Sequence, residues 1–322
     1  MIKKRSNLRT AIMLLSAALI CQTLPGHGQS AKKNDAGKRE LITTGKFVKI
    51  YDPSVGEKDS WYINDHAFIK GPGDRWHMIG ITGMDSAKPW DESNFAHAVA
   101  DSLMGKWTKK PYALSVSKEV NETVLWAPHI IKRDDTYYMY YCGGHPDHRR
   151  YQINLAVSKD LEKWSRYPGN PLFVDGYDGR DPFVFYDEYN KRWVLYYTAT
   201  SKPEKGAHIV AARISTDLVN WSKDRYVVFR DTTEKGTWGG NTESPFVIHR
   251  GDYYYLFIGP GASYKTTKVY RSRDMFNWDM DDEVADLDTH AAEIIQDKGK
   301  WYISSCGLLK GGLYLAPLYW ND

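Results

Sequence analysis

Three acidic residues stand in similar settings along the chain, and their side chains could carry out hydrolysis together. Asp65, Asp181 and Glu243 each lie within three residues of the start of a short apolar run with the composition of a β-strand. If the starts of these strands meet, one carboxylic acid could protonate a leaving oxygen while a second carboxylate activates water or attacks carbon. Like charges held close together would also raise the pKa of the acid toward the working pH. Such a set permits the cleavage of a glycosidic bond.

A repeat in the sequence explains how residues so far apart could meet. Tryptophans recur at positions 107, 164, 221 and 278, a constant step of 57 residues, and a short turn that contains aspartate precedes each one. A period near 50 residues is typical of a propeller or a similar array. Strand-like runs separated by turn residues fill every period. We interpret the repeated Asp and Trp as structural, a turn carboxylate and a tryptophan packed between blades.

The repeat predicts an all-β fold, a five-bladed β-propeller with about four strands in each blade. The fifth unit, which starts at Ala291, runs out of chain after its third strand. The run Lys46–Tyr51 could supply the missing strand, which would close the ring and cover an exposed edge. Because the innermost strands of a propeller converge on its axis, their starts should line one funnel. The residues at those starts are Asp65, His129 beside Trp126, Asp181, Glu243 and His290.

Composition limits the class of protein. The chain has 322 residues, of which 42% are hydrophobic, and this is enough to form a core and excludes wholesale disorder. Aromatic residues make up 14%, which favours β-structure and flat apolar contact surfaces. Lys and Arg number 43 against 40 Asp and Glu, so the net charge is +3, and much of the excess lies in the first 40 residues. The rest of the chain has no clustered basic face, so we expect no nucleic-acid partner.

The first 30 residues have the pattern of a secretory signal, in which basic residues precede a short apolar run and a small-residue cleavage zone. The apolar run Ala11–Ile20 is too short to span a bilayer, and no later run is long enough. We therefore expect a signal peptide over 1–30, a linker over 31–45 and the propeller over 46–322. The protein would be secreted or periplasmic. Lipid attachment at Cys21 is the alternative, although Leu19-Ile20 is a poor match to the small residue that this processing prefers.

Beyond the expected leader the chain has two cysteines, Cys142 and Cys306. Two cysteines cannot build a disulfide framework. We expect both to be buried, small apolar residues without a bridge.

The motifs around the acidic residues resemble those of the five-bladed propeller glycosidases, over roughly residues 46–320. Residues 61–65 (Trp-Tyr-Ile-Asn-Asp) look like the opening motif of glycoside hydrolase family 32, and residues 180–182 look like its Arg-Asp-Pro motif. Residues 126–128 look more like the Trp-Ala-Pro of family 43. Residues 243–245 (Glu-Ser-Pro) stand where family 32 has Glu-Cys and where family 43 has a similar Glu.

The resemblance implies a role for each carboxylate. Asp65 would be the base or nucleophile, Glu243 the general acid, and Asp181 the group that orients the sugar and tunes the pKa of the acid. Family 43 members often carry an axial histidine near a bound cation, so a structural calcium ion could lie near His290. Otherwise we expect His290 to be a hydrogen-bonded core residue, and we expect no other cofactor or metal.

Two features depart from family 32. His66 follows Asp65 where that family has proline, and the chain stops before the β-sandwich that normally follows the propeller. These departures weaken a fructosidase assignment and leave family 43, or a smaller relative such as family 117.

Flat aromatic faces and polar side chains near the funnel should bind the sugar. Trp61, Trp90, Trp126 and Trp238 lie in predicted loops or at strand starts near it, and Trp238 is flanked by glycines. The predicted substrate-binding residues are Asn64, His66, Trp126, His129, Arg180, Trp238 and His290.

Together these features predict a secreted exo-acting glycoside hydrolase that cleaves a terminal furanoside or pentoside of arabinofuranoside, xyloside or fructofuranoside type from an oligo- or polysaccharide. The stereochemistry stays open, because the family 32 likeness implies retention and the family 43 likeness implies inversion. The alternative from another class is a non-catalytic glycan-binding propeller with a degenerate site. A metal-centred enzyme that uses His66, His129 and His290 is a third reading, and no zinc-type spacing of histidines supports it.

Overall fold

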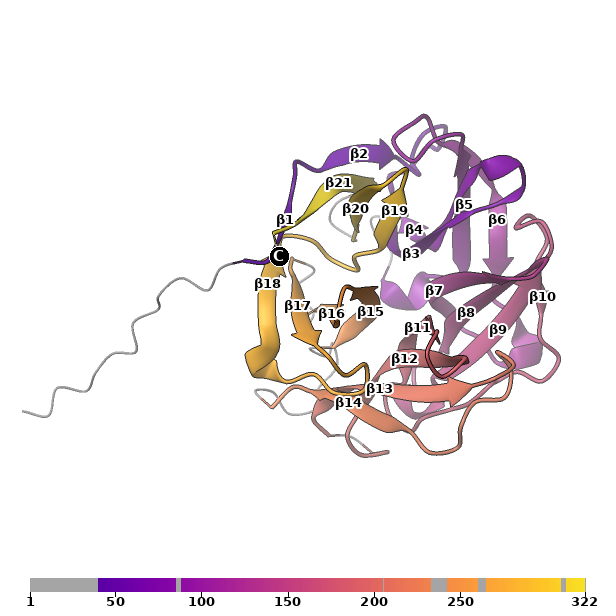
Figure 1. The fold of residues 1–322 in the computed structure, drawn as a ribbon. Coiled ribbons are helices and arrows are strands. Elements are labelled where there is room, and N and C mark those ends of the chain that lie inside the picture. The colour runs from indigo at the N-terminus through magenta and orange to yellow at the C-terminus, as the bar shows by residue number, and fades with distance from the viewer. Residues whose placement is uncertain are drawn as a thin grey trace, which may run out of the picture. The chain divides into compact units, whose positions relative to one another are not determined.

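The computed structural model describes residues 40–84, 88–204, 206–232, 242–259, 265–307 and 311–321 and arranges them in five antiparallel sheets around a common centre (Figure 1). Blade 1 contains β3 (Trp61–Lys70), β4 (Trp76–Met84), β5 (Asn94–Ala100) and β6 (Thr108–Ser115). Blade 2 contains β7 (Val124–Arg133), β8 (Thr136–Gly144), β9 (Gln152–Ser158) and β10 (Ser165–Arg166). Blade 3 contains β11 (Arg180–Asp187), β12 (Arg192–Thr200), β13 (His208–Ser215) and β14 (Tyr226–Arg230). Blade 4 contains β15 (Glu243–Arg250), β16 (Tyr253–Gly259), β17 (Thr267–Ser272) and β18 (Glu283–Leu287).

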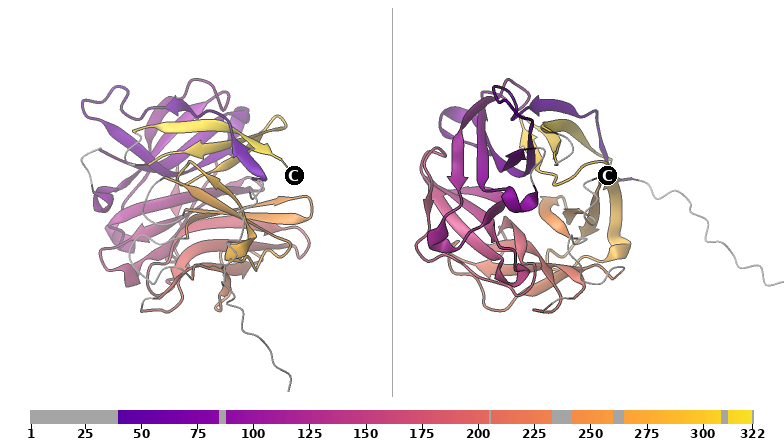
Figure 2. Two further views of the ribbon diagram at one scale, coloured as in Figure 1. Left: turned by 90° about the vertical axis from the view of Figure 1, so that its left-hand side faces the viewer. Right: turned by 180° about the vertical axis from the view of Figure 1, so that it is seen from behind.

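The fifth blade combines strands from both ends of the chain. It contains β19 (Ile294–Asp297), β20 (Lys300–Ser305), β21 (Leu313–Trp320), β1 (Ile42–Thr44) and β2 (Val48–Tyr51). Both N-terminal strands pair with β21, which Figures 1 and 2 show from several sides. The predicted five-bladed propeller, closed by the run at residues 46–51, is therefore confirmed. Residues 42–44, which were expected in the linker, form a strand because the Ile42 side chain is fully buried in the core.

Deleting residues 41–52 is expected to abolish soluble folding. The deletion strips β21 of both N-terminal partners and leaves an exposed strand edge, which favours aggregation. The measurement is the soluble fraction on expression, followed by a thermal unfolding curve of any soluble protein. Deletion of residues 31–38, in the predicted linker, is the matched control and should change neither result. Full stability of the protein without residues 41–52 would contradict the prediction that these residues close the ring.

A β-bulge interrupts the innermost strand of four blades at the same place. The pairing with the next strand shifts after Ile63, Trp126, Arg180 and Glu243. The residue that follows has a positive φ in three of these strands: Ala127 at 46°, Asp181 at 56° and Ser244 at 50°. Consecutive side chains of a regular strand point to opposite faces. A bulge re-aims side chains, so two neighbours in the sequence can both face the axis.

The repeated Asp and Trp residues have the structural roles that were predicted. Asp217 closes its turn by accepting hydrogen bonds from the backbone N–H groups of Val219, at 3.0 Å, and Asn220, at 2.7 Å. Trp107 and Trp278 are buried, and each indole N–H donates to a backbone carbonyl oxygen. The Trp278 ring also lies 6.1 Å from that of Tyr196 in blade 3, centroid to centroid, so it contributes to the contact between two blades.

Short 3₁₀ helices lie between the strands: η1 (Pro72–Asp74), η2 (Pro89–Asp91), η3 (Lys118–Val120), η4 (His148–Arg150) and η6 (Met280–Asp282). Over the part of the chain that the structure describes, no helix has the length and apolar character needed to span a membrane. Cys142 and Cys306 are free and buried, as predicted.

Candidate active site

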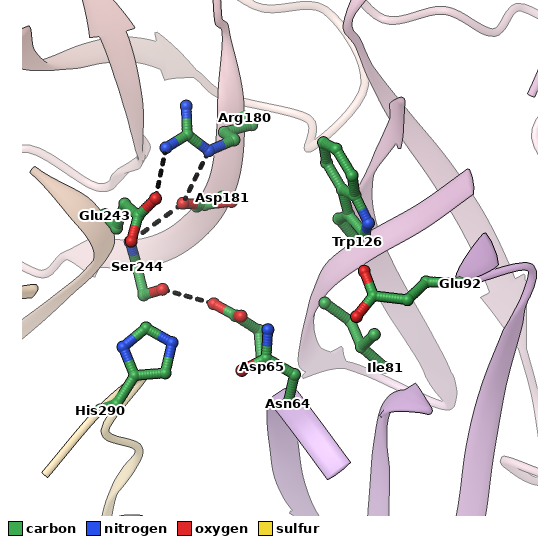
Figure 3. A pocket seen from close by; sticks show the side chains of 10 residues that line it. All are labelled: Asn64, Asp65, Ile81, Glu92, Trp126, Arg180, Asp181, Glu243, Ser244 and His290. Atoms are coloured by element: carbon green, nitrogen blue, oxygen red, sulfur yellow. Dashed lines mark hydrogen bonds and ion pairs between the residues drawn. The ribbon is translucent and has the colours of Figure 1, made fainter. Parts of the chain in front are cut away.

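One pocket at the centre of the ring collects side chains at or beside the starts of all five innermost strands. Its open volume is about 430 Å³, and its lining residues are Asn64, Asp65, Ile81, Glu92, Trp126, Arg180, Asp181, Glu243, Ser244 and His290 (Figure 3). Each of blades 1 to 5 supplies one lining residue near the start of its innermost strand: Asn64, Trp126, Arg180, Glu243 and His290. The bulges let the next residue, such as Asp65 or Asp181, face the same pocket. The structure thus brings together all three predicted carboxylates.

Ser244 connects the two aspartates. Its hydroxyl donates a hydrogen bond to Asp65 Oδ1, and its backbone N–H donates to Asp181 Oδ2 at 3.1 Å. Both donors belong to the residue inside the blade 4 bulge, where the positive φ turns the backbone. One residue of blade 4 therefore fixes carboxyl groups from blades 1 and 3 relative to each other.

Arg180 holds the third carboxylate. Its Nη2 lies 2.7 Å from Glu243 Oε1, its Nη1 lies 2.7 Å from Asp178 Oδ2, and its Nε lies 3.5 Å from Asp181 Oδ2. Asp178 also lies 3.2 Å from His148 Nδ1. The guanidinium is 5% exposed, so its charge is shared among these carboxylates at short range. Arg180 therefore lines the pocket as expected, and it also orients the side chain of Glu243.

The pocket carries more acidic than basic groups. Four carboxyl groups line it against the single guanidinium of Arg180. Burial raises the pKa of Glu243 to about 8: the charge of Arg180 opposes this shift, and repulsion from Asp181 and Asp65 adds to it. Burial also raises the pKa of Asp181 to about 6 and raises that of Asp65, although the hydrogen bond from Ser244 opposes the shift at Asp65. At neutral pH, Glu243 can therefore keep a proton while Asp181 carries a negative charge.

Two of the expected substrate-binding histidines do not line this pocket. His66 Nε2 lies 2.9 Å from Ser304 Oγ, and His129 Nε2 lies 3.2 Å from the carbonyl oxygen of Val184. Both histidines line a second cavity on the axis, next to the first, because they follow the bulge instead of preceding it. Burial lowers the pKa of each ring to about 4, so both are neutral.

The aromatic residues expected near the funnel have different positions. Trp126 lines the pocket, and Trp90 packs against it with ring centroids 5.4 Å apart. Trp61 does not line the pocket; it is the first residue of β3 and pairs with Met84. Trp238 lies outside the described residues. The expected residues Asn64 and His290 both line the pocket.

Three lining residues were not expected from the sequence: Ile81, Glu92 and Ser244. An alignment of the repeats could have found Ser244, because it stands before a proline in blade 4 as Asp181 does in blade 3. Glu92 follows η2 in a loop before β5. It lies outside the repeated strand starts, so the repeat carries no signal for it.

No group of three or more His, Cys, Asp or Glu side chains is arranged to hold a metal ion within the described ranges. His290 lines the pocket wall, and no such group surrounds it among the side chains that the structure describes. A calcium ion near His290 stays a prediction, and the chemistry below depends on side chains alone.

The arrangement of carboxylates can now be compared with known proteins. Residues 99–277, more than half of the chain, match the family model described as glycosyl hydrolases family 43. The chain belongs to this family. The matched residues include two of the pocket carboxylates, Asp181 and Glu243. The resemblance to family 43 propeller glycosidases is therefore confirmed.

Two curated relatives of this family 43 chain act on arabinose polymers, by their names. The chain is 29% identical over 262 residues to an extracellular endo-α-(1→5)-L-arabinanase of Thermotoga petrophila. This alignment covers 68% of the chain and 47% of the relative. It is 25% identical over 240 residues to an extracellular exo-α-(1→5)-L-arabinofuranosidase, ArbA, of Cellvibrio japonicus. This alignment covers 69% of the chain and 61% of the relative. The chain thus spans about half to three fifths of the length of these relatives.

Solved structures share the fold at lower identity. A β-xylosidase, RS223, superposes with a TM-score of 0.63 at 16% identity and covers 84% of this chain and 94% of its own. An exo-1,5-α-L-arabinanase from a bovine ruminal metagenomic library has a TM-score of 0.60 at 17% identity. The superposition covers 80% of this chain and 92% of the arabinanase. These likenesses support the propeller fold of the family 43 chain.

Proposed function

We propose that this family 43 chain is an exo-acting glycoside hydrolase that removes a terminal pentose from an oligo- or polysaccharide, with an α-L-arabinofuranosyl unit as the first candidate. The observation that carries the proposal is the meeting of Asp65, Asp181 and Glu243, from three blades, in one pocket. The names of both curated relatives, one acting within chains and one at their ends, support an arabinose-containing substrate. A xyloside or a fructofuranoside is the next candidate.

In the proposed reaction Glu243 and Asp65 act on opposite sides of the sugar. Glu243, whose raised pKa keeps it protonated, donates its proton to the glycosidic oxygen as the bond to the anomeric carbon breaks. Asp65 accepts a proton from a water molecule, whose oxygen attacks the anomeric carbon. The sugar then leaves with inverted configuration, as the family 43 resemblance implies. Asp181 stays ionised and keeps the pKa of Glu243 high.

The site on the axis favours attack at a chain end. The pocket is lined by the starts of converging strands, so a glycan reaches it along the axis of the ring. A terminal sugar can enter such a funnel, whereas the middle of a long chain would have to bend sharply to do so. We therefore place exo action in the proposal.

The proposal is tested by product analysis on linear α-1,5-arabino-oligosaccharides, with xylo- and fructo-oligosaccharides beside them. The expected result is a monosaccharide as the first product, while each oligosaccharide shortens by one unit at a time. Internal fragments as first products would overturn exo action. No product from any glycan, with binding still detectable by calorimetry, would favour the non-catalytic glycan-binding propeller.

The pH profile follows from the pKa shifts of the acid and the base. The value of kcat/KM should rise with pH as Asp65 loses its proton and fall as Glu243 loses its own near pH 8. Asp181→Asn removes a negative charge that raises the pKa of Glu243, so the falling limb should move to lower pH by about one unit. The matched control is Asp187→Asn at the other end of β11, where Asp187 accepts hydrogen bonds from Asn190 and Arg192. An unchanged falling limb in Asp181→Asn would contradict the tuning role.

We also propose that the protein is secreted. The basic and apolar pattern of its first 30 residues and the extracellular names of both curated relatives support this. Detection of the mature protein outside the cytoplasm, with its N-terminus near residue 30, would test the assignment.

A further inference from the structure

Glu92 is a carboxyl group in the pocket wall that the proposed mechanism does not use. It lies across the pocket from Glu243 and Arg180, next to Trp126 (Figure 3). The residue is 2% exposed, and its Oε1 accepts a hydrogen bond from the Tyr62 hydroxyl at 2.8 Å. The Trp126 side chain also hydrogen-bonds this carboxyl group.

A second buried glutamate shows what a structural role looks like in this fold. Glu122 is 4% exposed and accepts a hydrogen bond from the Tyr141 hydroxyl at 2.6 Å, just as Glu92 does from Tyr62. Glu122, however, also pairs with the guanidinium of Arg166, and it does not line the pocket. Among the described residues, no Lys or Arg forms an ion pair with Glu92. The ion pair that ties Glu122 into its blade therefore has no counterpart at Glu92, whose carboxyl group faces the pocket instead.

The surroundings of Glu92 are built to hold its carboxyl group in place. Tyr62, on β3, is fully buried, and its hydroxyl lies where a side chain at residue 83 would otherwise be. A Cβ atom at Gly83 would come within 2.6 Å of that hydroxyl, so glycine leaves the space that the tyrosine needs. The backbone carbonyl of Glu92 also accepts a hydrogen bond from Leu125 N at 2.9 Å, which ties its loop to blade 2. The carboxyl group is thus fixed from two blades while it faces the pocket.

The protonation of Glu92 suits recognition of a sugar hydroxyl. Burial raises its pKa to about 8, with repulsion from Asp65 in the same direction and the hydrogen bond from Tyr62 opposing the shift. A neutral carboxyl group offers one O–H donor together with acceptor oxygens. A hydroxyl group is also both donor and acceptor, so the two can pair in either sense. Negative charge is not needed on this wall, whereas Asp65 needs it for the reaction.

We propose that Glu92 is a substrate-binding residue that sets specificity by hydrogen-bonding one ring or side-chain hydroxyl of the terminal sugar on the wall opposite Glu243. The inference rests on the proposed function, because it assumes that the sugar occupies this pocket. It predicts that the enzyme discriminates against sugars that lack that one hydroxyl. A site that buries a polar group for a substrate hydroxyl leaves that group unpaired when the hydroxyl is absent.

The test compares deoxy substrates between the wild type and Glu92→Ala. The substrates are 4-nitrophenyl α-L-arabinofuranoside and its 2-deoxy, 3-deoxy and 5-deoxy analogues. For one analogue, removal of the hydroxyl should lower kcat/KM of the wild type by about 10- to 100-fold more than it lowers kcat/KM of Glu92→Ala. The losses caused by the other two analogues should be the same in both proteins. Equal losses for every analogue in both proteins would overturn the proposal.

Two further variants separate recognition from folding. Glu92→Gln keeps the shape of the side chain and, like the neutral carboxyl group, offers both a donor and an acceptor, so it should keep the wild-type pattern of deoxy effects. If Glu92→Ala fails to fold, Glu92→Met, which fills the space without a hydrogen-bonding group, should show the hydroxyl-specific change. Glu122→Gln is the matched control: it alters a buried glutamate that also meets a tyrosine, so it should lower thermal stability and leave the pattern of deoxy effects unchanged.

The failure of the inference can be told from the failure of the proposed function. If the wild type hydrolyses none of the aryl glycosides, the proposed function fails. Binding of methyl α-L-arabinofuranoside and its deoxy analogues, followed by NMR titration, still tests Glu92 without turnover. Weaker binding of the parent glycoside by Glu92→Ala than by the wild type, with no further weakening when the recognised hydroxyl is removed, would support the contact. Equal binding by both proteins would overturn it.

Discussion

Glu243→Gln is expected to lower kcat/KM on arabino-oligosaccharides by about 10²- to 10⁴-fold, because the alkoxide leaving group needs a proton as the bond breaks. The loss should be smaller than about 10-fold on 2,4-dinitrophenyl glycosides, since that leaving group is stable as an anion. The falling limb of the pH profile near pH 8 should disappear on both substrates, because an amide does not titrate there. The measurement is a pair of pH–rate profiles with the two substrates.

The matched control for this experiment lies in the same blade. Glu283, on β18, pairs with Lys268 at 2.8 Å near the outer edge of blade 4, so Glu283→Gln should keep the wild-type profile. An equal loss of Glu243→Gln on both leaving groups would argue against proton donation. Such a result would leave Glu243 as a residue that positions the sugar through Arg180.

Asp65→Asn is expected to lower kcat/KM by about 10²- to 10⁴-fold on every substrate, whatever its leaving group. The loss does not depend on the leaving group because the base acts on the attacking water. The rising limb of the pH profile, which Asp65 sets through its raised pKa, should be lost as well. Thermal unfolding of the variant checks that the ring is intact.

A small anion provides a second test of the same role. Azide attacks carbon without first losing a proton, so it should restore part of the turnover of Asp65→Ala on activated aryl glycosides. The matched control is Asp74→Asn, in the turn after β3, where the side chain is 78% exposed and pairs with Lys70. Retention of most activity by Asp65→Asn would place the base elsewhere in the pocket.

The architecture could be predicted because the sequence repeats with the period of the blades. The constant spacing of the tryptophans from Trp107 to Trp278 required equal structural units, and the alternation of apolar runs and turns within each unit set the strands. The boundary before β2 was wrong because Ile42–Thr44 is a three-residue strand without a pattern of its own. Its burial against β21 appears only once the ring is closed.

The carboxylates of the site could be predicted for the same reason, but only some of their neighbours could. Equivalent strand starts must meet at the axis, so Asp65, Asp181 and Glu243 follow from the repeat. The bulges change which neighbour faces the pocket. Pro128, Pro182 and Pro245 lie in three of them, but a proline alone does not tell which side chain a bulge turns inward. They bring Ser244 to the carboxylates and leave His129 beyond them.

The place of Glu92 in the pocket could not be predicted from the sequence for a different reason. It stands in a loop after η2, and its place in the pocket depends on how that loop folds against blade 2. A single acidic residue in a polar loop has the same appearance whether it faces solvent or the axis. Its burial and its hydrogen bond with Tyr62 are properties of the folded ring.

The central claim is that one pocket, through carboxylates of different blades, hydrolyses a terminal pentoside. The most direct measurement is the release of free monosaccharide from 4-nitrophenyl α-L-arabinofuranoside and β-D-xyloside by the wild type and by the double variant Asp65→Asn/Glu243→Gln. We predict release from at least one substrate by the wild type and none above the buffer rate by the double variant. Equal rates from both proteins, or binding of the sugar by the wild type without release, would contradict the claim.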